Sequence, residues 1–422
     1  MKHIPKPNSF SGILASAFFF FNEAKKSSIA VATVSFFNAD KGKKGRSKTR
    51  KVVWFGYLGG CLLLVLYSAV AFSQEPLDSV VYPEVKIEAQ RISQTIGSNV
   101  SETDSLLYSL LKSKGLTQIL ETESFISTRS YSPGGIANFS IRGTGSQHTQ
   151  VLWNGIPIND PMLGQTDLST ISLSGISNVR VLYGSAGLTN NSGGIGGSIE
   201  LISAPPRSKN GFEGNVNISA GSFGTYGFSI QLRDRYKKLF GTTAFEYRTA
   251  KNNFRYRNLA TIAQEEKQLE HALIKQLGFT KTVGVDINRK NRLSLNVYYA
   301  QVRRELPPTM LTTSTEETLF DRDIWAAIKW RRIGKRSVIN LTASYIYGKQ
   351  EYSDNNGYTF NHLYLANKNL IRYKLNLGHN IQLEIGGDVF AENAKSDSAY
   401  RNQPRWRYWQ AAFASLKYEP KK

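Results

Sequence analysis

The second half of the chain is a succession of runs in which polar and apolar residues alternate. The runs lie at 215–220, 227–232, 242–247, 292–298, 337–345 and 380–385. Alternation gives a β-strand one apolar and one polar face. Aromatic residues stand near the ends of several runs, as at Tyr298-Tyr299 and from Trp406 to Trp409. This pattern is typical of transmembrane β-strands, whose apolar face meets lipid while Asn, Gln, Ser and Lys face the lumen. A soluble β-sandwich alternates too and is the alternative.

The composition favours a membrane β-protein over a bundle of membrane helices. The 422 residues are 41% hydrophobic and 12% aromatic, and the mean hydropathy is -0.32, which is low for helices that fill a bilayer. The net charge is +21, of which residues 1–73 carry +9. Basic residues are scattered along alternating runs, as from Lys329 to Arg332, and form no basic helix, zinc finger or RNA-binding motif. We therefore expect no binding to nucleic acid.

A basic run followed by an apolar run predicts an export signal. Lys41 to Lys51 is densely basic, and Val52 to Ala71 is apolar or small. The run ends Ala71-Phe72-Ser73, with small residues at the two positions that a signal peptidase recognises. We predict that residues 1–73 are a signal peptide with an unusually long N-terminal extension, cleaved after Ser73. A membrane anchor is the alternative, because the apolar run is nearly long enough to span a bilayer.

The next segments predict a linker and a short helical region. Residues 74–99 are polar and carry Pro76 and Pro83, as a linker does. Ser101 to Leu120 repeats an apolar face at a spacing of three to four residues, and Gly115 interrupts it, so we expect two short helices. Thr128 to Gly135 contains Pro and paired Gly, which predicts a loop.

Four short β-branched pieces, each ended by Gly, Asn or Pro, then predict a small sheet with tight turns. They are Phe139 to Gly143, Val151 to Asp160, Ile176 to Leu182 and Gly193 to Ser203. Asn154-Gly155 is a strong hairpin signal. Gly194, Ile195 and Gly196 do not form a nucleotide-binding loop, because Ile199 stands where a third Gly is needed. No piece carries a nucleophile, an acid–base pair or a metal cluster, so we predict no catalytic residues and no enzyme activity.

The order of these four pieces resembles the plug domain of TonB-dependent outer-membrane receptors. The family's Ile-Arg-Gly signature, its Asp-Gly hairpin, its central strand and its Ile-Gly-Gly strand are all represented, with Asn154 in place of Asp. The sequence departs from the family at Tyr183-Gly184-Ser185 and Leu188-Thr189-Asn190, where Arg-Gly-Pro and Leu-Tyr-Gly are usual. The positions that carry the resemblance are Ile141, Arg142, Gly143, Asn154, Gly155, Gly193, Gly194, Gly196 and Gly197.

The resemblance implies a mainly β fold, with a small α+β plug domain inside a transmembrane antiparallel β-barrel. Residues 74–99 would be a periplasmic linker, 100–205 the plug and 206–422 part of the barrel. The barrels of such transporters have about 22 strands, whereas residues 211–422 leave room for roughly ten, so we expect the barrel to be incomplete in this chain. Long polar connections such as 252–270 and 307–318 are candidates for external loops.

The resemblance also implies partners. An unpaired strand on a tether can add to the edge of another protein's sheet, and the family uses such a TonB box to bind TonB and its inner-membrane energising complex. The alternating segment after Pro83 is the first candidate, and Leu77 to Val81 is a second. The residues of the first candidate are Glu84, Val85, Lys86, Ile87, Glu88 and Ala89.

The function implied is import of a scarce external ligand across the outer membrane of a Gram-negative cell, with a ferric siderophore or cobalamin as the expected class. The candidate ligand-facing residues are Arg129, Ser130, Tyr131, Ser132, Asn159, Asp160 and Met162. The few histidines are not clustered and Cys61 lies inside the export signal, so no metal site and no cofactor are expected. The alternatives are a passive porin-like or adhesive barrel, and a non-functional truncated receptor.

Overall fold

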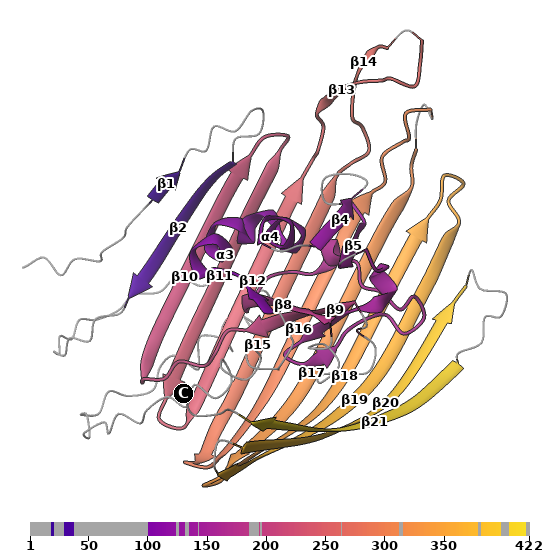
Figure 1. The fold of residues 1–422 in the computed structure, drawn as a ribbon. Helices are drawn as coiled ribbons and strands as arrows, with labels where there is room; N and C mark the ends of the chain where they lie inside the picture. The colour runs from indigo at the N-terminus through magenta and orange to yellow at the C-terminus, as the bar shows by residue number, and fades with distance from the viewer. Residues whose placement is uncertain are drawn as a thin grey trace, which may run out of the picture. The chain divides into compact units, whose positions relative to one another are not determined.

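The computed structural model describes residues 18–20, 29–37, 100–123, 126–130, 135–141, 143–184, 194, 196–262, 264–311, 315–378, 381–397 and 405–418. The described residues form two β-rich layers. One is a large antiparallel sheet, and the other is a small domain within residues 100–205 (Figure 1). The expected fold class is confirmed: mainly β, with a small α+β domain against a large antiparallel sheet.

The large sheet contains 12 strands in the described part of the chain, and ten of them follow residue 210. Its order is β1-β2-β10-β11-β12-β15-β16-β17-β18-β19-β20-β21, so β1 and β21 are the two edges. The strands are β1 (Phe18–Phe20), β2 (Ile29–Phe37), β10 (Gly211–Gly221), β11 (Thr225–Tyr236), β12 (Leu239–Ala250), β15 (Ile274–Asn288), β16 (Asn291–Glu305), β17 (Thr318–Ile333), β18 (Ser337–Ser353), β19 (Thr359–Gly378), β20 (Ile381–Ser396) and β21 (Arg405–Tyr418).

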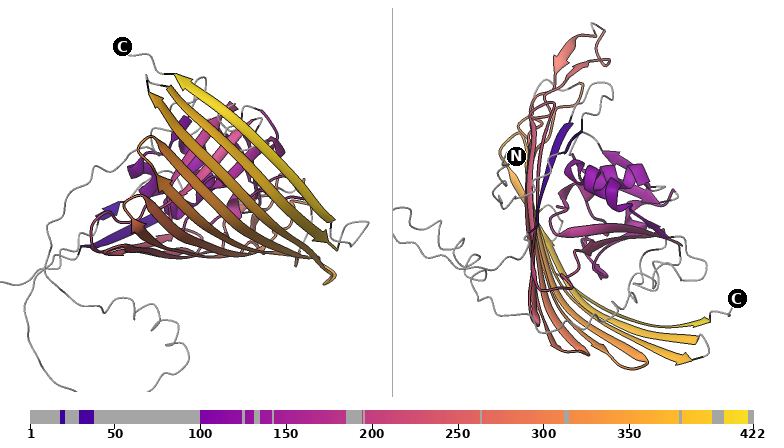
Figure 2. Two further views of the ribbon diagram at one scale, coloured as in Figure 1. Left: turned by 90° about the horizontal axis from the view of Figure 1, so that it is seen from below. Right: turned by 90° about the vertical axis from the view of Figure 1, so that its left-hand side faces the viewer.

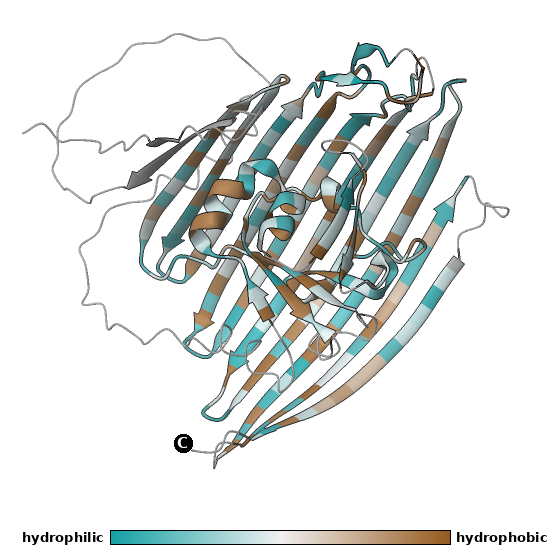
Figure 3. Ribbon diagram, turned by 45° about the horizontal axis from the view of Figure 1, so that its top comes forward, coloured by the Kyte–Doolittle hydropathy of each residue, from teal (hydrophilic) through white to brown (hydrophobic). Residues whose placement is uncertain are grey.

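The alternating pattern of the sequence gives the large sheet two different faces. On β16, Tyr298, Val302 and Arg304 are buried, whereas Leu293 and Leu295 on the opposite face are exposed. Successive side chains of a strand point to opposite faces, so exposed leucines mark the outer face and buried polar groups mark the face turned to the small domain. The alternation of hydrophilic and hydrophobic residues is visible along most strands in Figure 3.

The small domain is built on a five-stranded mixed sheet among the described residues, in the order β3-β8-β9-β6-β7. Strands β6 and β9 are parallel, and β8 pairs antiparallel with β9. A separate pair, β4 and β5, lies beside it, and the whole domain lies against one face of the large sheet (Figure 2). Its strands are β3 (Val100–Glu102), β4 (Ile126–Ser130), β5 (Ala137–Ile141), β6 (Thr149–Trp153), β7 (Ile156–Pro157), β8 (Ile176–Tyr183) and β9 (Gly197–Ser203).

The helical prediction is confirmed. Helix α3 (Ser105–Leu111) and helix α4 (Leu116–Glu123) are separated by a 3-10 turn, η2 (Lys112–Lys114), and by Gly115. Gly115 has a φ of 97°, which a residue with a side chain adopts only with strain. Two further 3-10 turns, η3 (Ser146–His148) and η4 (Leu168–Thr170), precede β6 and β8. Among the described residues, no helix combines the length and the apolar character needed to cross a membrane.

The hairpin at Asn154-Gly155 is also confirmed, because these two residues connect β6 to β7 with φ of 52° and 83°. The predicted loop from Thr128 to Gly135 is wrong in its first part. Residues 126–130 form β4, which pairs antiparallel with β5 from Ile126–Ile141 to Ser130–Ala137. The strand was missed because its five residues lie just before Pro133-Gly134-Gly135, and the sequence analysis assigned the last three of them to the same loop.

Two further features complete the description. The long connection after β12 contains a small hairpin of β13 (Arg255–Arg257) and β14 (Glu266–Gln268). Strands β1 and β2 come from the region assigned to the export signal, and β2 pairs antiparallel with β10. The sequence analysis predicted no strand there, while the predicted cleavage position at Ser73 lies outside the described residues.

Candidate functional site

The glycines among the signature residues of the small domain lie at turns and at places where two backbone segments approach closely. Gly143 and Gly155 have positive φ, and Gly197 has a φ of 138° in β9, where a Cβ would overlap the Leu182 carbonyl oxygen. A Cβ on Gly194 would lie 2.7 Å from the carbonyl oxygen of Gly197. The glycines therefore permit close packing of backbone, as expected. Ile141 is fully buried, and Arg142 and Gly193 lie outside the described residues.

The seven candidate ligand-facing residues have different positions. Arg129 and Ser130 are exposed on strand β4 and do not belong to a loop, contrary to the prediction. Met162 is exposed, with 48% of its surface accessible. Asn159 stabilises the turn within the small domain, because its side chain accepts a hydrogen bond from Val151 N and donates to the Thr149 and Gly164 carbonyl oxygens. Tyr131 and Ser132 lie outside the described residues, as do all six predicted TonB-box residues.

Asp160 joins its turn to the large sheet. One carboxylate oxygen accepts the backbone N–H groups of Met162 and Leu163, at 2.7 and 2.9 Å. The other oxygen lies 2.5 Å from His362 Nε2 on β19, and Asp160 is 8% exposed. Asp160 was predicted as ligand-facing, and the structure places it at a contact between the small domain and the sheet.

The segment Asp167–Ser174 makes the most extensive side-chain contacts with the large sheet. Arg304 of β16, which is fully buried, donates to Ser169 Oγ at 2.7 Å and contacts the carboxylate of Asp167 at 2.8 Å and that of Asp321 at 2.6 Å. A guanidinium at this depth is tolerated because two carboxylates and a hydroxyl bind its two terminal nitrogens, although its Nε has no partner among the described residues. The contact therefore joins the small domain to two adjacent strands, β16 and β17.

Side chains of the large sheet also form hydrogen bonds with backbone groups of this segment and with the Ser172 side chain. Ser172 N donates to the Tyr298 hydroxyl at 2.8 Å, and Ser172 Oγ donates to Glu246 at 2.7 Å. Thr280 Oγ1 donates to the Ser174 carbonyl oxygen at 2.6 Å, and Gln276 Nε2 donates to Thr170 at 3.3 Å. Because these backbone groups are not part of a strand ladder, the sheet supplies partners that they would otherwise lack.

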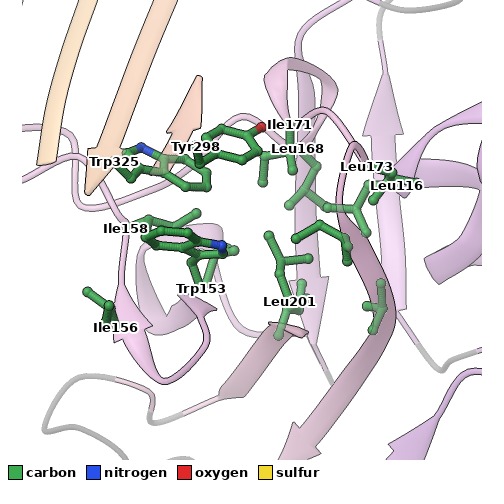
Figure 4. Close-up of a cluster of buried hydrophobic side chains, with 14 of the residues drawn as sticks. Leu116, Trp153, Ile156, Ile158, Leu168, Ile171, Leu173, Leu201, Tyr298 and Trp325 are labelled. Atoms are coloured by element: carbon green, nitrogen blue, oxygen red, sulfur yellow. The ribbon is translucent and has the colours of Figure 1, made fainter. Parts of the chain in front are cut away.

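Three aromatic rings form the centre of the interface (Figure 4). Tyr298 and Trp325, on β16 and β17, are stacked with ring centroids 3.9 Å apart, and Trp153 of β6 lies 5.7 Å from Trp325. All three are at most 2% exposed. Each aromatic pair contributes about 0.5–1.5 kcal/mol beyond its buried area. At the hairpin that follows β6, Lys329 Nζ donates to the Asn154 carbonyl oxygen at 2.8 Å.

The helical part of the small domain has a smaller set of polar contacts with the sheet. Arg248 of β12 donates to the Ser113 carbonyl oxygen at 3.4 Å and to Gln276 at 2.8 Å. Burial raises the pKa of the Tyr108 phenol well above its usual value, and the negative charge of Glu246 acts in the same direction. Burial lowers the pKa of the Lys112 ammonium, and Glu246 opposes that effect.

The sequence analysis missed the residues of the sheet that hold the small domain, which include Glu246, Gln276, Tyr298, Arg304 and Asp321. In the sequence, each of these residues is a polar, charged or aromatic position on an alternating run. Such a position indicates which face of the strand the side chain lies on, but it does not indicate which residue the side chain contacts. In the described residues, the interface consists of hydrogen bonds, ion pairs and aromatic contacts between the small domain and the large sheet. Among the described residues, no group of three or more His, Cys, Asp or Glu could hold a metal ion.

Comparison with known proteins agrees with this architecture. Residues 93–198 match the family model of the TonB-dependent Receptor Plug Domain. A stretch of 116 residues is 30% identical to the Vitamin B12 transporter BtuB of Photobacterium profundum. The aligned stretch covers 28% of this chain and 19% of that relative. The chain thus spans about a fifth of the length of this curated relative.

Solved structures show the same fold at low identity. The FrpB iron transporter of Neisseria meningitidis aligns with a TM-score of 0.65 at 10% identity, over 76% of this chain and 56% of its own. The ferric enterobactin receptor PfeA of Pseudomonas aeruginosa aligns with a TM-score of 0.57 at 13% identity, over 80% and 56%. Residues 93–198 are therefore similar to the plug domain of TonB-dependent receptors, and the large sheet with the small domain against it has the same fold as these solved structures.

Proposed function

We propose that the chain acts in the outer membrane as a TonB-dependent receptor that imports a scarce nutrient, such as a ferric siderophore or cobalamin. The observation that carries the proposal is the packing of a plug domain against the polar face of an antiparallel sheet whose other face exposes leucines. A strand with one apolar and one polar face suits a wall between lipid and an aqueous lumen. A domain bonded to that inner face would obstruct the lumen, so passage of a ligand requires the domain to move.

The proposed energy source is mechanical. Residues 84–89 alternate as a strand does and precede the plug domain, and an unpaired strand can add to the edge of a sheet in a partner protein. TonB, connected to an inner-membrane complex, would bind this segment and pull on the plug domain. No covalent bond of the ligand needs to be broken in such a process, so the proposed activity is transport.

Side chains exposed on the plug domain are the proposed first contacts for the ligand. Arg129, Ser130 and Met162 are exposed and remain candidates. Asn159 and Asp160 support the turn that presents Met162, so we propose for them a positioning role. The relatives named above include transporters of vitamin B12 and iron, and a receptor for ferric enterobactin. These ligand classes define the first panel to test.

The test is uptake in cells that carry the gene with one of two short deletions. Deletion of residues 84–89 should reduce uptake of the transported nutrient to the level of the gene knockout, while binding of the nutrient to the cell surface persists. Deletion of residues 77–81, the second candidate segment, is the matched control and should leave uptake intact. A passive porin-like barrel predicts unchanged uptake in both strains, and that result would refute energised transport.

A further inference from the structure

A cavity of about 180 Å³ lies between the plug domain and the large sheet. Asp160, Thr166 and Asp167 of the plug domain and Asp323, Trp325 and His362 of the sheet are among the residues that line it. Its volume is far above the roughly 10–15 Å³ that a single water molecule requires. The cavity is therefore large enough for a small organic group, and it is distinct from the exposed surface proposed for first contact with the ligand.

Negative charge exceeds positive charge around this cavity. Arg304 is shared by Asp167 and Asp321, so one guanidinium faces two carboxylates. Lys349, which also lines the cavity, is paired with Glu351 at 2.5 Å. Among these described residues, the fixed cations are already engaged by carboxylates.

Asp323 is the carboxylate that this arrangement leaves without a cation. It accepts a hydrogen bond from the Tyr364 hydroxyl at 3.2 Å, and no Lys, Arg or His in the described part of the chain lies within ion-pair distance of it. A neutral hydroxyl compensates a partly buried carboxylate less well than a cation does. An occupant with a positive charge would supply the missing partner.

Unpartnered polar atoms independently indicate an occupant. Trp325 is 2% exposed, and its indole Nε1 has no hydrogen-bond partner among the described residues. The same holds for Thr166 Oγ1 and His362 Nδ1, which belong to two other residues of the lining. Buried polar atoms in folded proteins are nearly always hydrogen-bonded, to protein, water or ligand. A donor inside the cavity can bond the Thr166 hydroxyl oxygen, whereas the Trp325 N–H is itself a donor and needs an acceptor such as water.

The aromatic side of the cavity suggests which cation fits. Trp325 and Tyr364 both line it, and Trp325 is stacked on Tyr298. Aromatic faces attract organic cations when these are removed from water, and planar guanidinium groups also form directed hydrogen bonds to carboxylates. We propose that this cavity is a binding site for a small organic cation, a guanidinium or alkylammonium group, held by Asp323 beside Trp325. The site goes beyond the proposed function, because it requires neither transport nor TonB.

The test is isothermal titration calorimetry on the full chain in detergent micelles. Methylguanidinium is the probe, and methylurea, which has the same shape without the charge, is its matched control. Saturable binding of methylguanidinium with none for methylurea is expected. Asp323→Asn should weaken the binding about tenfold or more, because a charge-assisted hydrogen bond is lost. Glu384→Gln, which removes a carboxylate of β20 paired with Lys374, should leave it unchanged.

A second variant keeps the proposal falsifiable if Asp323→Asn disturbs folding. Tyr364→Phe removes the hydroxyl that donates to Asp323 and keeps the aromatic ring, so methylguanidinium should bind equally well or more tightly. Weaker binding in Tyr364→Phe, equal binding of methylurea, or no saturable binding would each overturn the proposal, the last meaning that the cavity holds water alone. None of these outcomes depends on uptake, so failure of the site and failure of the proposed transport remain distinguishable.

Discussion

Two regions of the plug domain are stabilised in different ways. Asp167–Ser174 is fixed by side chains of the large sheet that lie 74 to 137 positions away in the sequence. Helix α3, in contrast, is stabilised mainly within its own domain. Its first turn is capped by Asp104, and its Tyr108 hydroxyl donates to the Ile176 carbonyl oxygen at 2.8 Å. Leu106, Leu107 and Leu110 of the helix are exposed to between 38% and 66%.

The difference indicates where a force on the plug domain would be resisted. A pull transmitted from residues 84–89 would reach the helical region before it reaches Asp167–Ser174, because the helices come first in the chain. The helical region has few polar bonds to the sheet to break, whereas Asp167–Ser174 has an ion-pair network and several hydrogen bonds. We therefore expect the contacts of Asp167–Ser174 to dominate the stability of the interface.

The largest effect is expected from Arg304→Met. The change leaves Asp167 and Asp321 buried without their shared cation, and loss of one partner from a buried ion pair costs about 3–5 kcal/mol. The free energy of unfolding, measured by urea titration with tryptophan fluorescence, should fall by that amount. The control is Arg303→Met, because Arg303 is exposed on the opposite face of β16. Equal losses in both variants would show that the network does not hold the two layers together.

An intermediate effect is expected from Gly278→Ala on β15. A Cβ at this position would overlap the Ser172 side chain and lie 3.3 Å from Ser174 Cβ, so the plug domain or the strand must shift. Overpacking of this kind costs about 1–3 kcal/mol. The matched control is Gly387→Ala on β20, where the nearest atom to a new Cβ is 3.7 Å away. If Gly278→Ala is as stable as Gly387→Ala in the same urea titration, the close approach of the two layers is not required.

The smallest effect is expected in the helical region and depends on pH. Burial lowers the pKa of Lys112, so the folded protein binds fewer protons than the unfolded chain at pH values between this lowered pKa and about 10.4. The free energy of unfolding should therefore rise with pH in that window through this group. Lys112→Met should remove that part of the rise, and Lys114→Met, at an exposed neighbour, should not. Identical pH profiles for the two variants would contradict the assignment.

Much of the fold could be predicted because its signals are local. Each alternating run chosen from the sequence lies largely within a strand of the large sheet, and Asn154-Gly155 and Gly115 mark the turn and the helix break that were expected. These features follow from side-chain alternation and from backbone conformations that few residues adopt. Strand β4 was missed because a short strand beside Pro and Gly has too little pattern to separate it from a loop.

The interface could not be predicted because its signals are not local. Arg304 was visible as one charge on an alternating run, but its partners are Asp167 in another domain and Asp321 on the next strand. Which residues meet depends on the register of neighbouring strands and on the orientation of the plug domain, and neither is encoded in a single run. For the same reason the sequence did not show that the second carboxylate oxygen of Asp160, a candidate ligand-facing residue, contacts His362 on β19.

Hydrogen exchange tests the central claim most directly, namely that the large sheet holds Asp167–Ser174 more firmly than it holds α3. The full chain in a membrane mimic would be exposed to deuterated water, and peptides covering 168–176 and 105–111 would be compared by mass spectrometry. Amides protected by stable hydrogen bonds exchange only when those bonds open. Slower exchange in 168–176 than in 105–111, and loss of that difference in Arg304→Met, are predicted. Equal or faster exchange in 168–176 of the unmodified chain would contradict the claim.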